Sequence, residues 1–176
     1  MWDSVANIGL ITLDAHHDLR DGQSNGSPVW RLIQAGLPGP RIVQIGISDF
    51  ANSREYAARA KDSGIHVIYR DELRRRPISD VMLEALDIAG EGNTEIYVDL
   101  DVDVCDRSVA PACPASTPGG ISADELRQAA YFAGKDARVR GLDIVEIDAA
   151  KDSEDQRTIR LGALLLLEAA CGVVAR

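Results

Sequence analysis

The feature that most constrains the fold of this chain is a series of five short apolar runs that alternate with helical patterns. Most of these runs are continuously apolar, which is typical of parallel strands that are covered on both faces. A β-α-β-α order requires right-handed crossovers and a three-layer α/β/α arrangement with a mainly parallel sheet. We expect strands at residues 7–13, 41–47, 66–69, 95–100 and 139–147, and helices at residues 27–35, 53–63, 79–89, 123–133 and 155–172.

Composition and charge narrow the class of protein. With 176 residues, of which 45% are hydrophobic, the chain is long enough for a single domain with a sizeable core. A net charge of −9 disfavours nucleic acid or an anionic membrane as a partner. Residues 161–174 are strongly apolar but contain Glu168 and fall short of the ~20 residues of a membrane span, so a buried helix is expected. Three cysteines without a C-x-x-C pair indicate reduced thiols in a cytoplasmic protein.

Two aspartate-rich segments directly follow apolar runs. The first is Asp14-Ala15-His16-His17-Asp18 and the second is Asp99-Leu100-Asp101-Val102-Asp103. Ligands of open parallel sheets bind beyond the carboxyl ends of the strands, and residues two apart in an extended chain point to the same side. We therefore expect one metal site formed by the side chains of Asp14, His16, Asp18, Asp101 and Asp103.

The donor types indicate the metal and the chemistry. Carboxylates with one imidazole suit hard to borderline octahedral ions, with Mn²⁺ first, and the lack of thiolates argues against a structural zinc site. Four clustered aspartates are costly to bury unless cations compensate their charge, and two divalent ions would do so. Two such ions roughly 3.5 Å apart can activate a water molecule at neutral pH. The sequence therefore predicts a metal-dependent hydrolase.

These motifs resemble those of the ureohydrolases, which include arginase, agmatinase and formimidoylglutamase. Residues 14–18 resemble the D-A-H-x-D segment of that family, and residues 143–146 resemble its D-x-x-E motif. Residues 101–106, followed by Pro111, Pro118 and Gly119-Gly120, resemble its D-x-D-x-x-D…P…P-G-G segment. The match extends over nearly the whole chain and implies an arginase-like α/β/α fold over residues 1–176.

The resemblance also implies a role for each matching residue. Asp14 and Asp101 would bridge two Mn²⁺ ions, and His16 and Asp103 would complete one of the two metal sites. Asp18 would bind the other ion and orient the nucleophile. Glu146 would face the amidino or guanidino group of a small-molecule substrate, because a carboxylate matches that planar cation. Asp18 and Glu146 are thus the predicted catalytic residues.

The loop after the first motif favours one subfamily. Residues 19–28 contain no histidine, whereas arginase and agmatinase carry one there. Formimidoylglutamases tend to have D-A-H-x-D-L-R followed by a Ser/Gly-rich turn, which is the pattern of this chain. Residues 155–161 also resemble the D-x-x-R-T-x-R-L ending of formimidoylglutamases. Glu146, Arg20 and Asn25 are the predicted substrate-binding residues, although a solvated or salt-bridged arginine is the more common role for Arg20. An arginase-type or agmatinase-type guanidino hydrolase is the alternative.

One departure from the family pattern bears on activity. The first metal ligand of the family is a histidine in an upstream G-G-x-H or G-G-H-D segment, and the thirteen residues before Asp14 contain no histidine. We expect a C-terminal portion of the family fold that lacks the N-terminal strands and has one incomplete Mn²⁺ site. The missing strands would leave one edge of the sheet open, and we expect homo-oligomerisation or a partner chain to cover it. The competing hypothesis is a catalytically impaired, ureohydrolase-like binding or regulatory subunit.

Overall fold

A parallel sheet lies at the centre of the computed structural model, which describes residues 4–176. Within this range the sheet has five strands in the order β3-β2-β1-β4-β5, and every strand pairing is parallel. The predicted parallel sheet is confirmed, and the strand ends differ only slightly from the expected ones. The strands are β1 (Ile8–Leu13), β2 (Ile42–Ile47), β3 (His66–Tyr69), β4 (Glu95–Asp101) and β5 (Val139–Val145).

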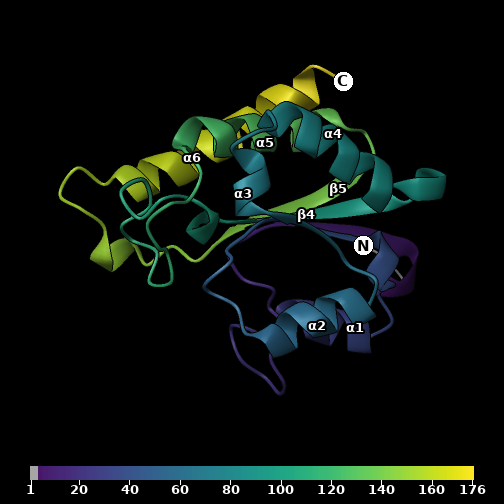
Figure 1. The fold of residues 1–176 in the computed structure, drawn as a ribbon. Helices are drawn as coiled ribbons and strands as arrows, with labels where there is room; N and C mark the ends of the chain where they lie inside the picture. The colour runs from purple at the N-terminus through teal and green to yellow at the C-terminus, as the bar shows by residue number, and fades with distance from the viewer. Residues whose placement is uncertain (1–3) are drawn as a thin grey trace.

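Helices cover the sheet from both sides, which confirms the predicted three-layer arrangement (Figure 1). Helices α1 (Pro28–Gln34) and α2 (Arg54–Asp62) lie on one side. The short helix α3 (Arg70–Leu73), which the sequence pattern did not predict, lies on the other side with three longer helices. These are α4 (Ile78–Ala89), α5 (Ala123–Lys135) and α6 (Arg157–Val174).

The ends of two helices follow from local sequence. Ser122 precedes α5, and its hydroxyl accepts a hydrogen bond from the backbone N–H of Glu125 at 3.2 Å. The Glu125 carboxylate accepts one in return from the backbone N–H of Ser122 at 2.7 Å, so a capping box starts this helix. Ser53 caps α2 through the backbone N–H of Tyr56. Each such cap stabilises its helix by about 1 kcal/mol.

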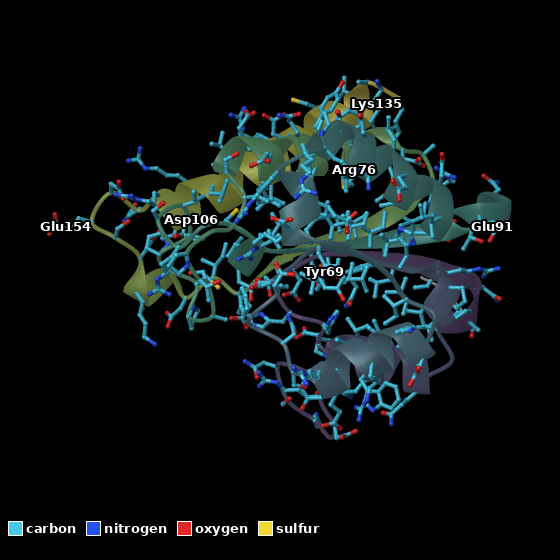
Figure 2. All side chains as sticks on the ribbon, in the orientation of Figure 1. Tyr69, Arg76, Glu91, Asp106, Lys135 and Glu154 are labelled. Carbon is cyan, nitrogen blue, oxygen red and sulfur yellow. The ribbon has the colours of Figure 1, made fainter. Side chains whose placement is uncertain are left out.

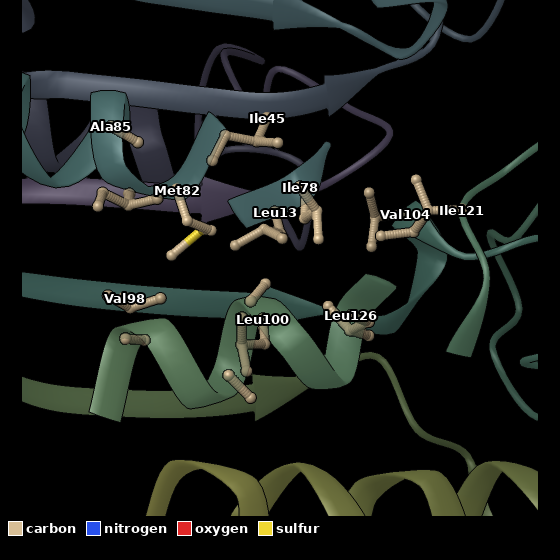
Figure 3. Close-up of a cluster of buried hydrophobic side chains, with 14 of the residues drawn as sticks. Leu13, Ile45, Ile78, Met82, Ala85, Val98, Leu100, Val104, Ile121 and Leu126 are labelled. Carbon is tan, nitrogen blue, oxygen red and sulfur yellow. The ribbon is translucent and has the colours of Figure 1, made fainter. Parts of the chain in front are cut away.

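The larger core lies between the sheet and helices α4 and α5 (Figure 3). Leu13, Val98 and Leu100 point from the strands toward Met82 and Leu126 of the helices, and all five side chains are fully buried. Burying a side chain of this size contributes about 1.5–3 kcal/mol. Contact between β1 and α4 is so close that a Cβ atom at Gly9 would lie 2.0 Å from the carbonyl oxygen of Ala89. Glycine is therefore required at this crossing, which fixes β1 against α4.

Helix α6 is less buried than its sequence suggests. One face packs closely on α5, where Gly134 lies against Ala169, but Leu166 and Leu167 are 60% and 61% exposed. The prediction of a buried helix is wrong, because the apolar residues extend around more of the helix than α5 covers. Among residues 4–176, no helix has the length and apolar character needed to cross a membrane.

Strand β5 forms one edge of the sheet, and the described residues place no further strand beside it. All but its first two residues, Val139 and Arg140, are half-buried.

Candidate metal centre

The carboxyl ends of β1, β4 and β5 meet at one end of the sheet. Leu13, the last residue of β1, pairs with Leu100, and Asp101 pairs with Val145 at the end of β5. In Figure 2, Glu91, which precedes β4, lies at one end of the molecule, whereas Asp106, which follows β4, lies toward the opposite end with Glu154. Both aspartate motifs and the D-x-x-E motif therefore emerge at the same end, where a ligand site of a parallel sheet is expected.

Backbone and amide hydrogen bonds hold the loop of residues 14–18. Asn52 donates to the carbonyl oxygen of Ala15 at 2.9 Å and accepts from the backbone N–H of His17 at 3.0 Å. Gln44 donates to the carbonyl oxygen of His17 at 2.9 Å, and its Oε1 lies 2.7 Å from Nδ1 of His17. His17 thus faces Gln44. Asp14 and His16 of the same loop face Asp103 of the second motif instead.

Donor atoms from the two motifs lie close together. Nδ1 of His16 lies 2.6 Å from Oδ2 of Asp103 and 3.4 Å from Oδ1 of Asp14. The other oxygen of Asp103 accepts a hydrogen bond from the backbone N–H of Ala15 at 2.8 Å, which ties the two motifs together. One ligand atom from each of Asp14, His16 and Asp103 falls within 4.8 Å of the others, and the same holds for Asp101, Asp103 and Cys113.

The clustered carboxyl groups perturb one another strongly. Burial and the charges of Asp103 and Asp18 raise the pKa of Asp14 well above its usual range. Burial and the charges of Asp14 and Asp103 raise the pKa of Asp101 to about 10. Burial acts in the same direction on Asp103, but the hydrogen bond and the charge of His16 outweigh it, so the pKa of Asp103 is lowered. A bound cation would favour the ionised form of all these groups.

The donor chemistry fits Mn²⁺. Carboxylate oxygens with a single imidazole nitrogen form the set that this ion prefers. Cys113, which comes from the loop between β4 and α5, is the exception. Burial raises the pKa of its thiol to about 12, so the thiol holds its proton in the absence of a cation.

The predicted substrate-side residues surround a small cavity beside these donors. Asp18 and Glu146 both adopt left-handed backbone, with φ of 54° and 63°, which is uncommon for residues other than glycine and concentrates at functional sites. Asp18 is not a member of either group of ligand atoms that lie within 4.8 Å of one another. Burial raises the pKa of its carboxyl group to about 6. All predicted site residues except Asp14, which is 2% exposed, line this cavity of about 70 Å³: His16, Asp18, Arg20, Asn25, Asp101, Asp103 and Glu146.

The Ser/Gly-rich turn brings Arg20 and Asn25 to this cavity. The backbone N–H of Arg20 donates to the carbonyl oxygen of Gly26 at 3.0 Å, which closes the turn. A Cβ atom at Gly26 would lie 2.7 Å from Cδ of Arg20, so the glycine leaves room for the arginine side chain. Arg20 is exposed, and its guanidinium is free to reach a ligand in the cavity.

Several residues that support the site were not predicted from the sequence. Arg70 is 7% exposed and points its guanidinium at the carbonyl oxygens of Asp103 and Val104, at 3.4 and 3.3 Å. Its position on the short helix α3 gave no sequence signal. The amides of Gln44 and Asn52 likewise carry no motif. Cys113 lies in the long loop between β4 and α5, where no motif marked it as a neighbour of Asp101 and Asp103.

Comparison with known proteins places this geometry in a family. A sequence model of the arginase family matches residues 2–172. Formimidoylglutamase from Halalkalibacterium halodurans is 40% identical over 165 residues, which are 91% of this chain and 51% of that protein. The crystal structure of formimidoylglutamase from Bacillus subtilis is 36% identical and superposes with a TM-score of 0.89, covering 94% of this chain and 53% of that chain.

A more distant structure supports the fold alone. Formiminoglutamase from Trypanosoma cruzi, crystallised with Mn²⁺, is 22% identical with a TM-score of 0.89 and covers 97% of this chain and 58% of that chain. In all these comparisons the present chain spans about half the length of the relatives it matches. The family match over residues 2–172 and the 40% identity to a formimidoylglutamase lead to one conclusion: the chain belongs to the arginase family of ureohydrolases.

Proposed function

We propose that this chain carries a Mn²⁺ site for hydrolysis of a linear C–N bond in an amidine or guanidine, with formimidoylglutamate as the first candidate substrate. The observation that carries the proposal is the cluster of Asp14, His16 and Asp103 beside the cavity that Glu146 lines. The similarity to two formimidoylglutamases, at 40% and 36% identity, supports the choice of substrate. Addition of water would release glutamate and formamide.

Each residue has a defined task in this proposal. Asp14, His16, Asp101 and Asp103 would hold one ion, and Asp18 would contribute to a second one. Bound Mn²⁺ would supply Lewis-acid activation of water.

The substrate contacts come from outside the donor cluster. The Glu146 carboxylate would bind the planar amidinium through paired N–H···O hydrogen bonds, which orients its carbon toward the nucleophile. Arg20 would pair with a substrate carboxylate.

One observation favours the alternative, a catalytically impaired binding or regulatory subunit. The chain contains three histidines, and only His16 joins the donor cluster. His17 faces Gln44, and Nε2 of His66 lies 3.2 Å from a carboxylate oxygen of Glu84 on α4. A second ion would therefore receive no imidazole from the described residues. Weak binding of the second ion would follow from this.

Metal titration and turnover assays separate the two functions. Calorimetric titration with Mn²⁺ is expected to show one tight site per chain; two tight sites would contradict the incomplete centre. Turnover is then measured with Mn²⁺ on formimidoylglutamate, arginine, agmatine and guanidinobutyrate, which also distinguishes the guanidino hydrolases. Absence of turnover on all four, with no Mn²⁺-dependent rise in melting temperature, would support the impaired subunit.

Two variants, one in the cavity and one on the surface far along the chain, test the role of Glu146 in the turnover assay. Glu146→Gln should leave Mn²⁺ affinity unchanged and lower kcat/KM by about 10²–10⁴-fold, because the amide loses the charge that binds the amidinium. Asp62→Asn, which changes an exposed carboxylate at the end of α2, should change neither quantity.

A further inference from the structure

One face of helix α6 is apolar and uncovered. The helix packs on α5 through its inner face, where Gly134 lies against Ala169 (Figure 1). Arg160 is the single charged side chain among the exposed residues between 159 and 174. The others are Ile159, Ala163, Leu164, Leu166, Leu167, Ala170, Cys171, Val173 and Val174. A contiguous exposed apolar surface of this kind marks an interaction site.

The exposed residues fall in two adjacent rows with the spacing of a coiled coil. Residues 159, 163, 166, 170 and 173 follow one another in alternate steps of four and three, and residues 160, 164, 167, 171 and 174 form the second row. Such steps keep a row of side chains on one side of a helix over several turns. With its 18 residues α6 is roughly 27 Å long. This outer face therefore suits another helix that lies along it.

The order of side-chain sizes along the outer face of α6 reads nearly the same in both directions. The pairs that lie equally far from the midpoint of the pattern are Leu166 and Leu167, Ala163 and Ala170, and Ile159 and Val174. An identical helix laid antiparallel about this midpoint would place leucine against leucine and alanine against alanine. Alanines opposite each other let two helices approach to an interaxial distance of about 8 Å. A second copy of this chain is thus complementary in shape to this face.

Charge favours the same arrangement. In the antiparallel pair, Arg160 of one copy would lie opposite Val173, in the last turn of α6 of the other copy. The carboxyl end of a helix carries partial negative charge and attracts cations. Arg160 has no ion-pair partner within residues 4–176, whereas Glu168, the one acid in α6, is already paired with Arg127. The arginine is therefore available to the end of a partner helix.

The neighbouring edge of the sheet is less available to a partner. A cavity of about 320 Å³ lies between the start of β5 and α6. Arg176 lines it and donates from its guanidinium to the carbonyl oxygens of Gly134 and Val139, at 2.9 and 3.2 Å. Arg140 of β5 is exposed beside it. Charged side chains on an edge strand hinder pairing with another strand, so the face of α6 is the better candidate.

We propose that two copies of this chain associate through the outer faces of α6, which pack antiparallel about the midpoint between Leu166 and Leu167. The association requires neither Mn²⁺ nor substrate, and it stands independently of the proposed function. The apolar face is then covered by its own symmetry mate, and each Arg160 lies beside the carboxyl end of the partner helix.

Light scattering over a series of protein concentrations in EDTA tests this proposal. The original protein should show an equilibrium of monomer and dimer. Leu166→Gln/Leu167→Gln should raise the Kd of the dimer at least tenfold, and circular dichroism should show that this variant is folded, because both leucines are 60% exposed or more in a single copy. The control is Leu83→Gln, which changes a leucine that is 52% exposed on α4 and should dimerise like the original protein. A monomer at every concentration, or a dimer that the double variant leaves unchanged, would overturn the proposal and assign the face to a different polypeptide or to none.

Disulfide cross-linking tests the direction of packing and does not depend on disrupting the interface. The background is Cys171→Ser, which removes the exposed native thiol. In this background Ala163→Cys/Ala170→Cys should form a covalent dimer on mild oxidation, because residues 163 and 170 of opposite copies face each other. Within one helix these residues lie about 10 Å apart, too far for a disulfide. Each single cysteine variant should run as a monomer under denaturing conditions. A single variant that cross-links to itself would indicate a parallel pair, and no covalent dimer of the double variant would contradict the interface.

Discussion

Replacing Asp101 with asparagine should stabilise the metal-free protein and reduce the further stabilisation that Mn²⁺ provides. Asp101 is 5% exposed, and its side chain accepts a hydrogen bond from the backbone N–H of Asp103 at 2.7 Å. Asparagine has nearly the same shape and can accept the same hydrogen bond. The substitution therefore changes the charge of the site with little change in its packing.

The magnitude follows from the pKa of Asp101, which burial and its neighbours raise to about 10. In the unfolded chain an aspartate has a pKa of about 3.9, and each unit of difference corresponds to about 1.4 kcal/mol, so keeping Asp101 protonated at pH 8 costs about 6 kcal/mol. Burying the new amide group costs about 1–3 kcal/mol. The net gain of about 3–5 kcal/mol corresponds to a rise in Tm of roughly 6–20 °C for a chain of this size.

Saturating Mn²⁺ should offset most of this advantage. A ligand at 100 times its Kd stabilises the protein that binds it by about 3 kcal/mol, and Asp101→Asn removes one of the proposed ligands. Thermal unfolding at pH 8 is measured in EDTA and in Mn²⁺, with Asp62→Asn as the control. Two results would show that Asp101 is not destabilised by burial and its charged neighbours. One is a Tm of Asp101→Asn in EDTA at or below that of the original protein, and the other is an equal rise in Tm of both proteins on adding Mn²⁺.

Three further predictions concern pH, packing and assembly. The free energy of unfolding of the metal-free protein should fall as pH rises from 5 to 9, because the raised pKa values of Asp18, about 6, and Asp99, about 8, mean that the folded state holds protons that the unfolded chain has lost. Urea titrations in EDTA check this trend, and a rising curve would contradict it. Gly9→Ala should cost about 2–4 kcal/mol in the same titrations, because its Cβ would overlap the carbonyl oxygen of Ala89, whereas Gly22→Ala, which meets no atom within 4 Å, should cost about 1 kcal/mol from its positive φ alone. Light scattering should show an oligomer, since β5 is an edge strand and apolar side chains of α6 are exposed; a monodisperse monomer would count against this.

Most of the fold was predictable because parallel strands carry a strong local signal. The runs that became β1 and β2 are buried along their whole length, whereas β4 alternates between buried apolar residues and more polar ones. The capping box at Ser122 marked the start of α5 directly. Helix α6 shows the limit of this reasoning. Its composition indicated burial, but exposure depends on how much of its surface α5 covers, and sequence periodicity alone does not reveal that.

The candidate site was predictable only where the backbone is regular. Asp101 ends a strand, so its direction follows from alternation along β4. The first motif lies beyond the end of β1, and the left-handed backbone of Asp18 breaks the extended geometry on which the predicted alignment depended. Cys113 and Arg70 reach the cluster from a loop and a short helix, and their positions are set by tertiary contacts that no local pattern encodes.

The hydrogen bonds of Gln44 and Asn52 to the loop of residues 14–18 have a consequence for how an ion would bind. These side chains are neutral amides, so they hold the loop without a cation. The loop therefore loses its conformational entropy when the protein folds, and not when an ion binds. The centre is preorganised, and chelation would remove an ion without melting the loop that presents His16 and Asp14.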